Sequence, residues 1–234
     1  MVTAIGDMIT LPALFLATFI ARNDALNAVV ATLCTAAAIG ALAWAVLRSS
    51  SAVKRTLLEM AGVSALVPLL DIFAGAVLEA HRTELEAIPG ILILIPPFVS
   101  QAGAIGGILS SRLSSKLQLG VITPRGRPER PARVDATVVV ALGLVVFTAI
   151  GAIAAVLASV TGVARPPAGL MVGGTVVAGV LVLPVTLVVG YYVAVLTTRF
   201  GLDPDNHGVP TITATLDLTG VAAVLFVMSV LGAT

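Results

Sequence analysis

Residues 136–160 read ATVVVALGLVVFTAIGAIAAVLASV, a run of 25 residues without one charged side chain. A helix needs about 20 predominantly apolar residues to cross roughly 30 Å of hydrocarbon. The run is long enough to span a bilayer as a helix, so it indicates a membrane fold rather than a soluble one.

The composition extends this conclusion to all 234 residues. Hydrophobic residues make up 58% and charged residues 11%, against roughly 25% charged residues in ordinary soluble domains. So few charges cannot cover such an apolar interior, which excludes soluble enzymes and disordered chains. The net charge of +1 offers no field that would attract a nucleic acid. Barrel strands alternate apolar and polar residues, whereas these runs are continuous, so we expect an all-α polytopic membrane protein.

The stock of metal ligands favours hard cations. One cysteine, Cys34, and two histidines, His81 and His207, leave little for zinc or copper. The twelve carboxylates are a richer supply, and hard cations prefer oxygen ligands.

Seven apolar segments are long enough to cross the membrane: 4–21, 25–47, 56–80, 88–111, 134–162, 168–198 and 209–233. The proline-rich and arginine-rich stretch 112–133 is predicted to be a surface loop beside anionic headgroups, outside the ion path. If the N-terminus is cytoplasmic, ten Lys and Arg residues lie on the cytoplasmic side and three on the other. The excess of positive charge inside therefore predicts that the N-terminus is cytoplasmic and that the C-terminus lies outside. We expect a multi-pass protein of the plasma membrane.

Segment 88–111 contains the residues that most affect helix continuity. Pro96 and Pro97 are predicted to break the helix, because proline removes backbone donors. Gly103 and Gly107 form a G-x-x-x-G pattern that favours close helix packing over a ligand role. Gln101, with Gly103, is a possible pore-lining residue. In the next segment, the simplest role of Asp135 is that of an N-cap.

Two acids occur in matching contexts near the two ends of the chain. Asp7 follows Thr3 by four residues and Asp217 follows Thr213 by four, and both stretches read T-A-x-x-D. Residues four apart share a helix face, and charges at membrane depth usually face a polar cavity. We therefore expect both pairs to face one lumen, where Gly220 leaves space for an ion. The alternative is an acid near a helix start, which the helix dipole favours.

Other polar residues could line the path or its entrance. Asp71 lies deep in segment 56–80, either as a vestibule ligand or as a carboxylate bonded to a neighbouring helix. Asp203, Asp205 and Asn206 precede the last segment. They form a turn and helix cap, or place two carboxylates at the cytoplasmic mouth below Asp217, and the two interpretations are compatible.

Three stretches resemble the MgtE-type magnesium transporters, especially their eukaryotic solute-carrier relatives. LDPDN at 202–206, followed by Pro210 and T-A-x-x-D at 213–217, resembles the last-helix signature of that family. PGILILIP at 89–96 and LSSRLS at 109–114 are similar to its second helix, and DMITLP at 7–12 looks like another final helix. The resemblance implies a five-helix transport domain at 55–234. It also implies that 1–54 holds the last helix of a first unit and a connecting helix.

The resemblance further implies a mechanism, because domains of that family work as parallel pairs around a two-fold pore axis. Mg²⁺ would be the transported ion, held by Asp217 and Asp7, with no organic cofactor. A second copy of the chain or a companion chain would complete the pore. Two alternatives stay open: a non-transporting membrane subunit or half-transporter that needs a companion, and, less expected, an intramembrane enzyme. The enzyme would need clustered acids or an intramembrane Ser and His, and the sequence has neither.

Overall fold

The computed structural model describes residues 69–232 and, before them, seven single helical positions: Val29, Leu33, Ala36, Gly40, Trp44, Arg48 and Val67. The chain divides into two units, Met1–Glu59 and Met60–Thr234, and the description below concerns the second. Within it, the side chains of Asp205 and Asn206 are outside the described set.

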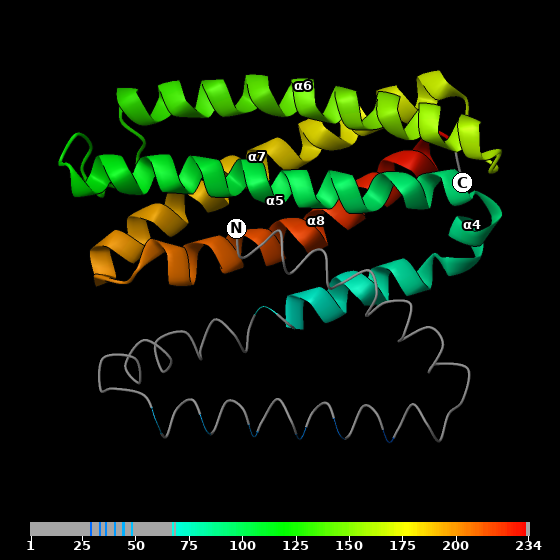
Figure 1. Cartoon of the computed structure of the whole chain (residues 1–234). Coiled ribbons are helices and arrows are strands. Elements are labelled where there is room, and N and C mark those ends of the chain that lie inside the picture. The colour runs from blue at the N-terminus through cyan, green and yellow to red at the C-terminus, as the bar shows by residue number, and fades with distance from the viewer. Residues whose placement is uncertain are drawn as a thin grey trace. The chain divides into compact units, whose positions relative to one another are not determined.

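The described range is built from helices (Figure 1). A helical segment over 69–80 is followed by α4 (Arg82–Ala87), α5 (Pro89–Gln118), α6 (Arg130–Thr161), α7 (Ala168–Phe200), the short π-helix η1 (Pro204–Gly208) and α8 (Val209–Val230). Among these residues, α5, α6, α7 and α8 are the four helices long and apolar enough to cross a membrane. The all-α membrane fold is therefore confirmed.

The last four predicted spans correspond to these four helices, with ends that move by up to seven residues. The predicted count of seven is not supported, since four candidate spans occur among the described residues. The predicted spans 4–21 and 25–47 lie outside the described residues apart from single positions, and 56–80 lies only partly inside them. The six-residue helix α4 was not predicted, because it is short and carries three charged residues.

The predicted break at Pro96 and Pro97 is wrong, because α5 runs through both residues without interruption. Helix α7 likewise continues through Pro184. Proline removes a backbone donor, but membrane helices tolerate this where neighbouring helices and local adjustments satisfy the freed carbonyls.

The connection between α5 and α6 is shorter than predicted. Helix α5 continues to Gln118 because Leu113 and Leu117 remain buried, and α6 already begins at Arg130, so the loop is 119–129 rather than 112–133. Pro131 lies in the first turn of α6, where its missing N–H costs no hydrogen bond. Asp135 therefore lies inside α6, and the predicted N-cap role belongs to Glu129 instead.

Helices α5 and α7 form the centre of the bundle, since each contacts the other three long helices. The rings of Phe98 on α5 and Phe147 on α6 pack with centroids 4.6 Å apart. A Cβ added at Gly179 of α7 would lie only 2.3 Å from the Phe147 ring. This glycine therefore permits the close approach of α6 and α7.

Helix α8 packs antiparallel along α5 through small residues. A Cβ added at Gly103 would lie 3.2 Å from Thr213, and one at Gly106 would lie 2.6 Å from Ile212. A Cβ at Gly107 would meet nothing within 4 Å. The packing pair is therefore Gly103 and Gly106, not Gly103 and Gly107 as predicted, because α8 crosses α5 on the side of Gly106.

Candidate functional site

Asp217 is the central candidate of the site and lies half-buried in the first half of α8. Its neighbours on the helix, Leu216 and Gly220, are buried. Within the described residues, no hydrogen bond or ion pair to its carboxylate is formed. A charged group without a partner in an apolar bundle is costly, so its presence there favours a functional role over a structural one.

Asp71 is brought into electrostatic range of Asp217. It lies on the helical segment 69–80 with an exposed side chain, and its negative charge acts on the Asp217 carboxylate. Like charges in a medium of low dielectric repel strongly, and a cation between them relieves that repulsion. These two predicted acids lie on different helices and act on each other electrostatically.

Thr213 shares the helix face of Asp217, as the four-residue spacing predicts. Its hydroxyl donates to the carbonyl oxygens of Val209 at 3.1 Å and Pro210 at 3.0 Å. Because its only proton is committed to the backbone, the hydroxyl oxygen is left as an acceptor. The water molecules around a hydrated cation point their hydrogens outward, so they can donate hydrogen bonds to such an acceptor.

Gly220 has a packing role in this structure. A Cβ added there would lie 3.3 Å from Val99 of α5, and Phe98 lies next to the same position. The space beside Gly220, which the sequence assigns to an ion, is therefore occupied by side chains of α5. Gly103 is similarly buried against Thr213.

Two of the remaining predicted residues, Gln101 and Asp203, have exposed side chains. Gln101 is exposed on α5, about 200° around the helix from Gly103, which faces α8. Asp203 is exposed just before η1, and Asp205 and Asn206 lie within η1. Thr3 and Asp7 lie outside the described residues. The expectation that Asp7 and Asp217 face the same lumen therefore stays a prediction.

The donor set fits a hydrated ion better than a bare one. In the described part of the chain, no group of three His, Cys, Asp or Glu side chains could hold a metal ion. Two carboxylates and a hydroxyl oxygen cannot replace all the waters of a cation. Mg²⁺ in particular keeps several waters and is usually held by one or two carboxylates.

A second polar face of α8 was missed by the sequence analysis. Thr211, Thr215 and Thr219 are half-buried, and each hydroxyl donates to the carbonyl oxygen four residues earlier, at 2.7, 2.7 and 2.8 Å. This face lies on another side of the helix from Asp217, at 100° per residue. The sequence pattern that could have indicated this polar face is the recurrence of threonine every four residues in the last apolar run.

A charge network at the loop end of α5 and α6 was also missed. Asp135 is 1% exposed and accepts hydrogen bonds from Arg112 at 2.8 Å and from Lys116 at 2.5 Å. The Lys116 ammonium also donates to the carbonyl oxygen of Pro131 at 3.2 Å. The sequence pattern that could have indicated this network is a pair of basic residues four apart, with an acid near the start of the next apolar run. The network joins α5 to α6 and lies away from Asp217.

The chain matches one family model, described as a divalent cation transporter and named MgtE, over residues 95–227. The match covers more than half of the chain, from the second turn of α5 to the last turn of α8. No curated protein and no solved structure matches the chain. The range matched by the family model includes Asp217 and the two glycines, Gly103 and Gly106, at which α8 packs against α5. The chain belongs to the MgtE family of divalent cation transporters.

Proposed function

We propose that this chain carries Mg²⁺ across the plasma membrane and that Asp217 is the residue that binds the hydrated ion. The observation that carries the proposal is the half-buried carboxylate on α8, which has no hydrogen-bond partner within the described residues and lies in the field of a second acid. Such an arrangement destabilises the empty bundle and attracts a divalent cation. The membership of the MgtE family supports divalent cations as the substrate class.

In the proposed mechanism, Asp217 accepts hydrogen bonds from the waters of the ion rather than displacing all of them. The hydroxyl oxygen of Thr213, one turn earlier, accepts a further water hydrogen, since its own proton is held by the backbone. Asp71 supplies a second negative charge at the entrance. Mg²⁺ loses its waters reluctantly, so a site that accepts the hydrated ion lowers the barrier to its passage.

The pore itself would form between two such domains. We propose that two copies, or this chain and a companion, pair so that Asp217 faces a second acid, which is Asp7 if it lies in the same pore. In this arrangement the N-terminus is cytoplasmic and the C-terminus outside. The native mass of the detergent complex distinguishes a homodimer from a pair with another chain.

The test is Mg²⁺ flux into liposomes that contain only this chain. Asp217→Asn keeps the shape and removes the charge, and it should abolish flux while the protein stays folded, because an unpaired buried carboxylate stabilises nothing. Asp71→Asn should reduce flux less. Glu86→Gln is the matched control: it also removes one carboxylate, but from an exposed ion pair with Arg82, and it should leave flux unchanged.

Wild-type flux in the Asp217→Asn variant would show that the ion site is elsewhere. Absence of flux from the unmodified chain in liposomes would instead support the alternative of a half-transporter that needs a companion. Asp7→Asn separates the two pairing arrangements, since it abolishes flux only if Asp7 faces the same pore.

A further inference from the structure

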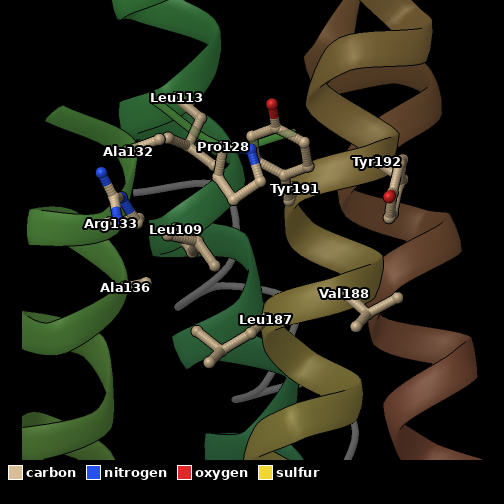
Figure 2. A pocket seen from close by; sticks show the side chains of 10 residues that line it. All are labelled: Leu109, Leu113, Pro128, Ala132, Arg133, Ala136, Leu187, Val188, Tyr191 and Tyr192. Atoms are coloured by element: carbon tan, nitrogen blue, oxygen red, sulfur yellow. The ribbon is translucent and has the colours of Figure 1, made fainter. Parts of the chain in front are cut away.

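An apolar groove of about 260 Å³ lies between α5, α6 and α7, at the end of the bundle that carries the loop 119–129. Figure 2 shows Leu109 and Leu113 of α5, Ala136 of α6 and Leu187 of α7 on its walls. Nothing in the ion site uses this groove, because its walls belong to a different set of helix faces. It is open to the outside of the bundle along α7, where Val188 is 55% exposed.

The groove lies at the level where the helices leave the hydrocarbon. On α5, the first charged residues of the helix, Arg112 and Lys116, flank Leu113. Tyr191 and Tyr192 of α7 line the groove, and tyrosine is enriched where hydrocarbon meets headgroups. Their hydroxyls donate to the carbonyl oxygens of Arg125 at 2.9 Å and Gly126 at 3.1 Å, which ties the loop over this end.

The rim of the groove carries an unneutralised positive charge. Arg133 of α6 lines the groove and is exposed, and its guanidinium forms no ion pair with any residue that the structure describes. Arg112 and Lys116 differ, because Asp135 neutralises them in part. Between residues 112 and 135 there are six basic and two acidic side chains, so the surroundings of Arg133 are positive as well.

We propose that this groove binds one anionic phospholipid, with an acyl chain along the apolar walls and the phosphate at Arg133. An apolar slot beneath a free guanidinium at the membrane interface complements a ligand with an apolar tail and an anionic head. This inference is independent of the ion site and holds whether or not Asp217 binds Mg²⁺.

The experiment uses tryptophan quenching by brominated lipids on the full chain. Trp44, the one tryptophan of the sequence, is replaced by Phe, and Val188→Trp places a new indole at the groove. The protein is reconstituted in phosphatidylcholine vesicles that contain a minor fraction of brominated phosphatidylglycerol or, in the matched arm, brominated phosphatidylcholine. Brominated phosphatidylglycerol should compete for the site about fivefold better, the factor expected from about 1 kcal/mol per basic side chain near the surface.

Four variants in this background identify the groove as the cause. Arg133→Gln should remove most of the preference for phosphatidylglycerol, and Arg133→Lys should keep it. Arg127→Gln removes the same charge from the loop but does not line the groove, so it should keep the preference. Ala136→Phe fills the groove without changing any charge and should remove the preference as well. Each variant is compared with its parent for elution as a single species and for unfolding temperature.

Three results would overturn the proposal. Equal quenching by the two lipids in the parent protein would show that the groove has no preference for anionic headgroups. Equal losses in Arg127→Gln and Arg133→Gln would show a diffuse surface attraction instead of a site. Absence of quenching by either lipid would show that protein covers the groove, either the first unit of the chain or a second copy.

Discussion

The carboxylate of Asp135 on α6 lies 2.5 Å from the ammonium nitrogen of Lys116 on α5, and the same side chain binds Arg112. The Asp135 side chain is 2% exposed, but those of Arg112 and Lys116 are 53% and 26% exposed, so its removal leaves two cations that solvent can reach. We therefore expect Asp135→Ala to destabilise the protein by about 1–2 kcal/mol through the lost charged hydrogen bonds, less than when one partner of a fully buried pair is removed. The unfolding temperature in detergent measures this.

The control for this prediction is Glu86→Gln, which breaks an exposed ion pair with Arg82. Exposed ion pairs contribute little to stability because solvent screens them, so the unfolding temperature of this variant should stay close to that of the unmodified protein. If Asp135→Ala unfolds at the same temperature as this control, the network does not hold α5 to α6.

Gly106 and Gly107 are neighbours with opposite surroundings, which makes them a matched pair. A Cβ at Gly106 would lie 2.6 Å from Ile212 and 2.8 Å from Leu216, whereas one at Gly107 meets nothing within 4 Å. We expect Gly106→Ala to cost about 1–3 kcal/mol through overpacking against α8. Gly107→Ala should be neutral or stabilise by up to about 1 kcal/mol through helix propensity. A larger loss in Gly107→Ala than in Gly106→Ala, measured by thermal unfolding, would contradict the packing of α8 on α5.

The loop 119–129 should loosen in acid because of Glu129. The hydroxyl and the backbone N–H of Thr123 donate to its carboxylate, and these hydrogen bonds lower the pKa of Glu129. A group whose pKa is lower in the folded state stabilises that state above its ordinary pKa. The contribution is lost as the pH falls through the lowered pKa.

Hydrogen exchange at the Thr123 amide, followed against pH, tests this expectation. Protection should fall as the pH drops below the ordinary range of a glutamate. In Glu129→Gln the exchange should lose that acid dependence, apart from the known dependence of the intrinsic exchange rate. An unchanged acid dependence in the variant would rule out the Thr123–Glu129 contact as the cause.

The loops before α6 and after α6 should lie on opposite faces of the membrane, because a single span separates them. In a Cys34→Ala background, cysteines introduced at Arg125 and Arg165 should react with an impermeant reagent from opposite sides. The excess of basic residues predicts that position 125 is the cytoplasmic one. Labelling of both positions from one face would refute the topology and the parallel pairing of domains that depends on it.

Hydropathy alone predicted the four long helices well, because runs of more than twenty apolar residues have few alternatives in a membrane. Hydropathy predicted the helix ends poorly where a helix extends beyond its apolar run into charged residues. Arg112 and Lys116 were assigned to a loop, yet Leu113 and Leu117 bury the same turns against the bundle. A linear sequence shows that charges are present, but not that Asp135 neutralises two of them across a helix contact.

The candidate site was predicted in part for a similar reason. Asp217 and Thr213 share a face through their spacing alone, which a sequence displays directly. The effect of Asp71 on Asp217 depends on how two helices that are distant in the sequence pack, which the spacing of residues along the chain does not show. The sequence shows that Gly220 has no side chain, but not which neighbouring helix fills the space beside it. In the structure, Val99 of α5 fills that space.

The lengths of the helices imply a limit on the thickness of the host bilayer. With 30, 32 and 33 residues, α5, α6 and α7 extend about 45–50 Å, whereas the 22 residues of α8 extend about 33 Å. The hydrocarbon layer of a typical membrane is about 30 Å thick, and common tilts do not absorb such an excess. The charged turns at the joined ends of α5 and α6 must therefore project into the headgroup layer. The uncharged run 136–160 of α6 alone extends about 38 Å, so even a thicker, sterol-rich bilayer would leave the Asp135 network outside the acyl chains. Hydrophobic mismatch therefore disfavours thin membranes for this protein.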